Sequence, residues 1–179
     1  GHMFKHSIFI LLFVFSSNVM ADGFYLSSSD LQGQISDDQV FNGFGCTGRN
    51  ISPQLSWKNA PAGTKSFAIT AYDPDAPTGS GWWHWLAFNL PSSVDGLKTG
   101  ASNKAMPAGA IESITSFGNR GFGGACPPEG DKAHRYIFTV FALDTDKIEQ
   151  DANATPNLIG YMLNAHVIAK ASIMAYYAR

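Results

Sequence analysis

The chain has 179 residues, a length that favours one domain with a core of ordinary size. Hydrophobic residues make up 45% of the chain and charged residues 15%, against about 25% charged in ordinary soluble domains, which disfavours a disordered chain and a charged coiled coil. The formal net charge is −2, so the chain has no global positive field to attract nucleic acid, and no nucleic-acid partner is expected.

The first 21 residues have the organisation of an export signal behind a cloning scar. Residues 1–3 resemble a scar, and Lys5 precedes an apolar run at 8–15 that is followed by small residues. The run is shorter than the roughly 20 residues of a membrane-spanning helix; the alternative is a buried N-terminal helix. We predict that residues 1–21 are scar plus signal peptide, and that 22–179 is a single exported domain, periplasmic or secreted, without stable membrane insertion.

Two cysteines, Cys46 and Cys126, remain in the predicted exported part. An even number of cysteines in a protein sent to an oxidising compartment predicts one disulfide. A bridge that closes a loop of this length stabilises a fold by about 4.5 kcal/mol in the chain-entropy model. The alternative is two unrelated buried thiols.

Short extended segments punctuated by Gly, Pro, Asn and Ser follow one another along most of the domain. Runs rich in aromatic and apolar residues occupy 67–72 and 85–89, and an almost unbroken apolar strand covers 136–143. Shorter candidates lie at 54–57 and 113–117. No internal repeat or linker divides the chain, so we predict a mainly β fold, an all-β sandwich.

The end of the chain has a helical period. Thr155 is a good N-cap and Pro156 a good first helical residue, and apolar residues then recur at helical spacing up to Tyr176. We predict a C-terminal helix over 156–177, packed by its apolar face on the sandwich. His166 lies close to that face, where a hydrogen-bonded structural role is favoured over ligand binding.

The segment 72–85 combines carboxylates, prolines, a histidine and tryptophans between two predicted strands. Asp73 and Asp75 alternate with prolines that stiffen the turn, so the carboxylates are held in place. His84 opens the next strand. If the two strands pair as a hairpin, the carboxylates and the imidazole meet at the same end of the sheet.

A loop rich in glycine and proline at 118–136 leads into the central apolar strand and contains Cys126 and His134. Glycines let backbone N–H groups approach a ligand and form an anion-binding concavity. No Gly-Lys-Ser/Thr follows and no helix is predicted there, so neither a P-loop nor a dinucleotide site is supported. The alternative is a set of tight-turn glycines, but a disulfide through Cys126 would fix the shape of the loop.

We predict that His84 and His134 line one pocket, each beside Asp73 or Asp75 and close to the loop amides. A carboxylate beside an imidazole favours the protonated ring, so these histidines would carry positive charge. The result is a small anion site for one phosphate or carboxylate, with an apolar wall of tryptophans and Phe122 at its mouth.

Several motifs of this sequence recur in a known family: Asn50-Ile51-Ser52-Pro53-Gln54-Leu55-Ser56-Trp57, Asp73-Pro74-Asp75-Ala76-Pro77, Trp82-Trp83-His84-Trp85, and the glycine loop from Gly121-Phe122-Gly123-Gly124 to His134-Arg135-Tyr136. On these motifs the sequence resembles the phosphatidylethanolamine-binding protein family, also called Raf-kinase-inhibitor-like proteins, and within it the exported bacterial branch of the YbhB/YbcL type. The resemblance runs from Ser27 to Arg179.

The resemblance implies a Greek-key β-sandwich of two antiparallel sheets with peripheral helices, and a shallow pocket for anions such as phosphate, including phospholipid headgroups. The pocket residues that it implies are Asp73, Asp75, His84, Gly124, Pro128, His134 and Tyr136, with Trp82 as a wall. Phe122 stands where many relatives have Tyr, so a rim hydroxyl is missing. Eukaryotic relatives inhibit kinases, a role that does not carry over to an exported protein.

We therefore predict a non-enzymatic binding protein for a small anionic ligand, with no cofactor or resident metal. One alternative is a metal-assisted hydrolase that uses Asp73, Asp75, His84 and His134 as ligands or as an acid–base pair, although no Gly-x-Ser-x-Gly or His-Glu-x-x-His motif occurs. Another is a secreted module that inhibits a protein partner. A homodimer stays an open alternative.

Overall fold

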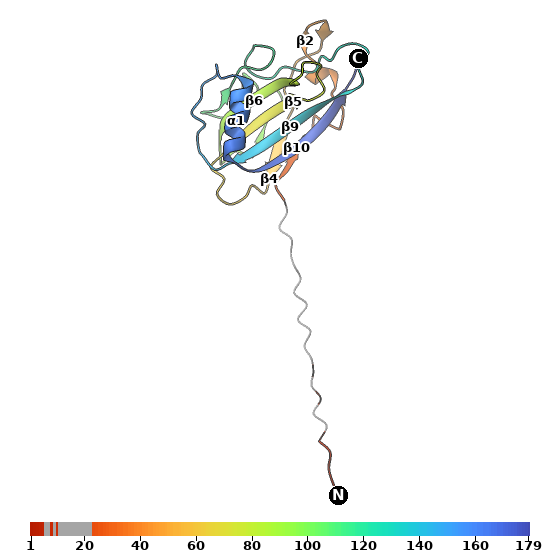
Figure 1. The fold of residues 1–179 in the computed structure, drawn as a ribbon, viewed down its shortest axis with the longest axis vertical. Coiled ribbons are helices and arrows are strands. Elements are labelled where there is room, and N and C mark those ends of the chain that lie inside the picture. Colours follow the sequence, from red (N-terminus) through yellow and green to blue (C-terminus); the bar gives the residue numbers. More distant parts are fainter. Residues whose placement is uncertain (6–7, 9, 11–22) are drawn as a thin grey trace.

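The computed structural model describes residues 1–5, 8, 10 and 23–179, so most of the predicted signal peptide lies outside the described residues (Figure 1). The elements, in chain order, are β1 Tyr25–Ser27, the 3-10 helix η1 Asp37–Gln39, β2 Asn42–Gly43, β3 Cys46–Thr47, β4 Leu55–Lys58, β5 Ser66–Asp73, β6 Trp82–Pro91, β7 Gly96–Leu97, β8 Ile111–Glu112, β9 His134–Leu143, α1 Pro156–His166 and β10 Val167–Tyr177. Within the described part of the chain, no helix is long and apolar enough to cross a membrane.

A five-stranded antiparallel sheet in the order β10-β9-β5-β6-β8 is the centre of the molecule (Figure 1). A three-stranded sheet, β1-β4-β7, and a two-stranded hairpin, β2-β3, complete the strands of the described residues. The mainly β prediction is confirmed, but the described strands form three sheets where two were expected. The Greek-key connection stays a prediction.

Two apolar cores hold these layers together. The larger core lies between the five-stranded sheet and the three-stranded sheet and includes Trp57, Trp85 and Phe138. The smaller core lies on the other face of the main sheet, where Ile159 and Leu163 of α1 pack against the sheet. Covering both faces explains why the central strands read as near-continuous apolar runs rather than as an alternating pattern.

Most of the predicted strands are confirmed. The runs at 67–72, 85–89 and 136–143 lie inside β5, β6 and β9, and the candidate at 54–57 overlaps β4. The strand predicted at 113–117 is wrong. Thr115 closes a turn by donating its backbone N–H to the Asn119 carbonyl, and Gly118 has a φ of 85° that a strand does not allow.

The predicted C-terminal helix is wrong in its second half. Thr155 caps α1 and Pro156 begins it, as expected, but the helix ends at His166 and the chain continues as β10. The residues of β10 alternate between inward and outward positions, a period of two that apolar residues on both faces concealed. This segment forms a strand because it pairs with the edge of β9 that would otherwise be open, and the pairing covers the whole length of β9.

His166 is a hydrogen-bonded residue at the end of α1, as predicted. Its Nδ1 lies 2.8 Å from Oδ1 of Asp144, and its backbone carbonyl accepts a hydrogen bond from the Asp144 N–H. This contact joins the end of the helix to the end of β9, away from the segments that carry the other two histidines.

The order of strands brings three sequence segments to one end of the main sheet. Strand β5 ends at Asp73, which pairs with Trp82 at the start of β6, so the predicted hairpin is confirmed. Strand β9 is antiparallel to β5 and begins at His134, beside the end of β5. The polar side chains at the end of β5 and at the starts of β6 and β9 therefore lie at the same end of the main sheet.

Candidate functional site

A cavity of about 190 Å³ lies at this end of the sheet. Its lining is mainly aromatic, aliphatic and proline side chains around a few polar ones. The lining residues are Phe44, Asp73, Ala76, Pro77, Thr78, Trp82, His84, Phe117, Cys126, Pro127, Pro128, His134 and Tyr136. Six of the eight predicted ligand-binding residues are in this set, while Asp75 and Gly124 are not.

The floor of the cavity contains a buried ion pair. His134 and Asp73 are each about 3% exposed, and the Nδ1 of His134 donates to Oδ2 of Asp73 at 2.6 Å. The other carboxylate oxygen of Asp73 accepts the backbone N–H of Asp75 at 2.8 Å. Asp73 is therefore held from two sides, as expected of a buried carboxylate.

A second carboxylate, which the sequence reasoning did not include, reaches His134 from outside. Oδ2 of Asp131 lies 2.9 Å from Nε2 of His134, so both ring nitrogens face carboxylate oxygens. Carboxylates only accept, so both nitrogens carry a proton and the ring is an imidazolium. Burial lowers the pKa of His134, but the hydrogen bonds to Asp73 and Asp131 outweigh it and raise the pKa above its usual value. In the sequence, the only indication of this contact is that Asp131 lies three residues before His134.

His84 has the opposite environment. It is 5% exposed, and its Nδ1 lies 2.7 Å from the carbonyl oxygen of Gly123 rather than beside a carboxylate. Burial lowers the pKa of His84, and the Gly123 carbonyl and Asp73 oppose the shift without reversing it. The expectation that both histidines carry positive charge is therefore corrected: the surroundings of His134 favour the charged ring, and those of His84 favour the neutral ring.

One polar group of His84 and one of Tyr136, both on the cavity lining, have no hydrogen-bond partner among the described residues. No hydrogen bond reaches Nε2 of His84 or the hydroxyl of Tyr136, yet neither atom is among the fully buried polar atoms without partners, which are Trp57 Nε1 and Ser113 Oγ. Both groups are thus accessible from the cavity. Burial raises the pKa of Tyr136 well above its usual value, so its hydroxyl stays a hydrogen-bond donor.

Asp75 lies beside the cavity but does not line it. Its carboxylate forms a bidentate pair with Arg135, with Nη2 to Oδ1 at 2.8 Å and Nε to Oδ2 at 3.0 Å. The side-chain hydrogen bond to Arg135 lowers the pKa of Asp75 to about 2. Asp75 therefore does not back either histidine directly, and its contribution to the floor is the backbone bond to Asp73.

Gly124 and its neighbours do not form the predicted anion-binding concavity, because their N–H groups are already occupied. The amide of Gly123 donates to the His84 carbonyl, that of Gly124 to Oδ1 of Asn50, and that of Ala125 to the Gln39 carbonyl. A Cβ on Gly124 would lie 2.2 Å from the Gln39 carbonyl oxygen, so the absence of a side chain serves close backbone packing.

The mouth of the cavity is apolar, but not from the residue expected. Phe122 is 8% exposed and packs in the core against Trp85 and Phe138, so the rim does not contain it. Phe44 and Phe117, which sequence reasoning missed, stack at the mouth with ring centroids 5.7 Å apart. The signal for Phe44 is a large apolar residue between two glycines in a turn, where it is 68% exposed.

Trp82, Pro127 and Pro128 also line the cavity. The Trp82 ring meets the edge of Phe117 at a centroid distance of 5.4 Å. Trp82 and Pro128 therefore occupy the lining positions that the resemblance implied for them.

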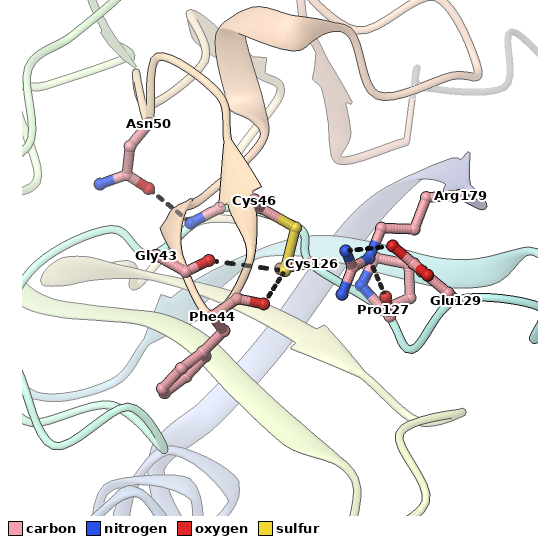
Figure 2. The surroundings of a disulfide bond; sticks show 9 residues. Gly43, Phe44, Cys46, Asn50, Cys126, Pro127, Glu129 and Arg179 are labelled. Atoms are coloured by element: carbon pink, nitrogen blue, oxygen red, sulfur yellow. Dashed lines mark hydrogen bonds and ion pairs between the residues drawn. A yellow bond between two sulfur atoms is a disulfide. The ribbon is translucent and has the colours of Figure 1, made fainter.

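The predicted disulfide between Cys46 and Cys126 is confirmed, and it joins the β2-β3 hairpin to the proline loop (Figure 2). The carbonyl oxygens of Gly43 and Phe44 lie 3.7 and 3.6 Å from Sγ of Cys126, so the turn that carries Phe44 sits directly on the bridge. A structural disulfide is compatible with an oxidising compartment.

The C-terminal residue fixes the other side of the proline loop (Figure 2). Nε of Arg179 donates to the Pro127 carbonyl at 2.5 Å, and its Nη1 lies 3.4 Å from the Glu129 carboxylate. The loop between Cys126 and His134 is thus attached at the bridge, at Arg179 and at Asp131.

The four residues proposed as metal ligands do not converge. Asp73 contacts His134, but Asp75 is paired with Arg135 and His84 with a carbonyl. Among the described residues, no group of three or more His, Cys, Asp or Glu side chains is arranged to hold a metal ion.

Comparison with known proteins agrees with this fold. The phosphatidylethanolamine-binding protein family model matches residues 31–178. YbcL of Escherichia coli is 49% identical over 173 residues, 94% of each chain, and YbhB of the same organism is 48% identical over 157 residues, 86% of this chain and 99% of that protein.

Solved structures show the same relationship. The crystal structure of E. coli YbcL, described as a new member of the mammalian PEBP family, has a TM-score of 0.86 at 50% identity and covers 87% of this chain and 98% of that chain. A PEBP homologue from Chlamydia trachomatis has a TM-score of 0.73 at 28% identity, with 89% and 99% coverage. This chain therefore belongs to the phosphatidylethanolamine-binding protein family, among relatives of the YbcL and YbhB type.

Proposed function

We propose that this protein binds a small ligand that combines a phosphate or similar oxyanion group with an apolar portion, without converting it. The observation that carries the proposal is the convergence of the unpartnered Tyr136 hydroxyl and Nε2 of His84 on a cavity whose other lining residues, apart from the Asp73–His134 pair and Thr78, are aromatic, aliphatic, proline or cysteine residues. Such pockets, with few polar groups on apolar walls, are typical of small-molecule sites.

The charge on the cavity floor supports an oxyanion group. The His134 imidazolium lines the cavity together with Asp73, and the carboxylates of Asp73 and Asp131 carry two negative charges against its one positive charge, so attraction for an anion is confined to contact with the ring itself. Because Asp131 is partly exposed and the histidine is buried, an anion entering the cavity would meet the positive ring at short range and the Asp131 charge through solvent. The Tyr136 hydroxyl would donate a hydrogen bond to the same anion.

The residues at the mouth of the cavity support the second part of the proposal, that the ligand has an apolar portion. Phe44, Phe117 and Trp82 line the same cavity as the floor residues and provide aromatic surface for an alkyl or aromatic group attached to the oxyanion. The family description, phosphatidylethanolamine-binding, agrees with a phosphate-bearing ligand of this kind.

Binding without turnover is part of this proposal. Both ring nitrogens of His134 are hydrogen-bonded to carboxylates, so His134 is not free to act as a general base, and the free Nε2 of His84 is the group whose role a hydrolysis assay tests. Stoichiometric bound metal together with hydrolysis of a phosphate ester or carboxylic ester would overturn this part of the proposal. We place the protein in the periplasm, because the predicted signal peptide and the disulfide fit the same oxidising compartment.

Calorimetry with inorganic phosphate and phosphoethanolamine tests the pocket. Replacing His84 and His134 together by alanine should abolish binding. Tyr136→Phe should weaken it about tenfold, as expected for loss of a hydrogen bond to a charged group. Tyr161→Phe is the matched control, since Tyr161 is exposed on α1 and should leave affinity unchanged. Unchanged binding by the double variant would refute the pocket assignment.

A further inference from the structure

We infer that this pocket selects phosphate monoesters, which bring their own acidic proton, over phosphate diesters, and that a diester binds only together with a proton taken up by His84. The inference rests on the proposed function and names the class of ligand for the same site. It follows from the tautomer of one buried histidine.

The tautomer is set by the contact with Gly123. A carbonyl oxygen can only accept, so the Nδ1 of His84, 2.7 Å away, must carry the ring proton. In the neutral ring, Nε2 then presents a lone pair to the cavity. A fully ionised oxyanion also presents only lone pairs, so the two repel unless a proton lies between them.

The surroundings of His84 keep the ring neutral. The backbone of Gly123 and Gly124 and, from β5, Asp73 attract a proton to the ring, whereas from β9 His134 repels it, and the Tyr136 hydroxyl is uncharged. Phe117 and Tyr136 pack edge to face with the ring at centroid distances of 5.4 and 5.2 Å. Burial among these rings outweighs the attraction of the Gly123 and Gly124 backbone and of Asp73, and lowers the pKa of His84.

Monoesters and diesters differ in how they supply the missing proton. A phosphate monoester has a second pKa of about 6, so roughly a tenth of it carries a P–OH group at pH 7. That hydroxyl can donate to Nε2 of His84 while another oxygen accepts from Tyr136. A diester has no acidic proton at this pH, so the proton must come from solvent and reside on the buried ring.

A matched pair of ligands tests the inference: phosphoethanolamine is a monoester, and glycerophosphoethanolamine is a diester with the same ammonium group. At pH 7.5 we expect the monoester to bind at least about tenfold more tightly. The affinity for the diester should rise as pH falls, because binding is linked to proton uptake. Calorimetry at pH 5.5 in two buffers of different ionisation enthalpy should show uptake of about one proton with the diester and clearly less with the monoester.

His84→Gln provides the decisive variant, because an amide can donate without taking up a proton. His84→Gln should reduce the difference in affinity between the monoester and the diester, and it should remove the pH dependence of diester affinity. The control His166→Gln should change neither quantity. A preference that arises from the size of the second ester group would survive His84→Gln and would overturn the inference.

The outcomes separate the inference from the proposed function. If neither ligand binds between pH 5 and 8, the proposed function fails. If both bind equally to the wild-type protein, with equal proton uptake at pH 5.5, the inference alone is wrong. The proton counts come from the wild-type protein, so they decide the matter even if His84→Gln does not fold.

Discussion

The floor and the mouth of the pocket are built in different ways. The floor is formed by residues at the ends of β5, β6 and β9, whose positions follow from strand pairing, and its buried carboxylate and both imidazole Nδ1 atoms are hydrogen-bonded. The mouth is formed by the β2-β3 turn and the proline loop, which a disulfide, Arg179 and aromatic stacking hold in place. Recognition of charge therefore depends on the sheet, and recognition of the apolar portion depends on loops.

The difference predicts that changes in the two regions have separable effects. A change in the floor should alter both the free energy of unfolding and the affinity for the oxyanion. A change at the mouth should alter affinity only for ligands with an apolar portion, unless it removes a covalent constraint. The following predictions test this separation.

Loss of the disulfide should have the largest effect on stability. Cys46→Ser combined with Cys126→Ser removes a bridge between residues 80 positions apart, which should lower the free energy of unfolding by about 4 kcal/mol. Urea unfolding of the variant and of the wild-type protein measures the difference. A decrease below about 1 kcal/mol would mean that aromatic stacking alone holds the hairpin.

Removal of His134 should have the next largest effect. His134→Ala leaves Asp73 buried and unpaired, which should lower the free energy of unfolding by about 3 kcal/mol at pH 7. The control is His166→Ala, where the pair with Asp144 is partly exposed and the loss should stay below about 1 kcal/mol. Equal losses in urea unfolding would contradict the difference between a buried floor pair and a surface pair.

The two floor histidines should affect stability with opposite dependence on pH. The raised pKa of His134 stabilises the fold below pH 6.5, its unfolded value, and this contribution is lost as pH rises through the folded pKa. The lowered pKa of His84 contributes above pH 6.5 and is lost as pH falls toward its folded pKa. The difference in free energy of unfolding between the wild-type protein and His134→Ala should fall from pH 5 to pH 8, and that between the wild-type protein and His84→Ala should rise, as measured by urea unfolding.

Asp131→Asn should affect one histidine selectively. Loss of one of its two carboxylate partners should lower the titration midpoint of His134, followed by NMR of the ring protons, by about one pH unit. The His84 ring, which Asp131 does not contact, should titrate as in the wild-type protein. A shift of His84 instead would show that the two rings are more closely coupled than their contacts indicate.

The smallest effect should come from the exposed lip of the mouth. Phe44→Ala should leave the free energy of unfolding within about 0.5 kcal/mol, because the ring is mostly exposed. Affinity for a ligand with an alkyl or aromatic group should fall about fivefold, while that for inorganic phosphate stays constant. Equal losses for both ligands in calorimetry would show that the mouth also shapes the floor.

Sequence reasoning located the site better than it described the partners within it. The proline-stiffened carboxylates and His84 were correctly assigned to one hairpin end, and His134 to the start of the facing strand. The predicted pairing of His134 with Asp73 is right, but the other partners are wrong: His84 bonds to a carbonyl, Asp75 to Arg135, and the loop amides to other residues. Hydrogen-bond partners depend on distances between segments far apart in the chain, and these distances follow from packing.

By itself, the sequence determined three strands of the central sheet (β5, β6 and β9), the start of α1, the disulfide and the segments that meet at the pocket, because periodicity, turn residues and residue chemistry are local properties. Only the tertiary structure decided that the last segment is β10 rather than helix, since the open edge of β9 had to be paired. Only the tertiary structure decided which histidine is charged, because burial and the nearest acceptor, not residue type, set the pKa of an imidazole.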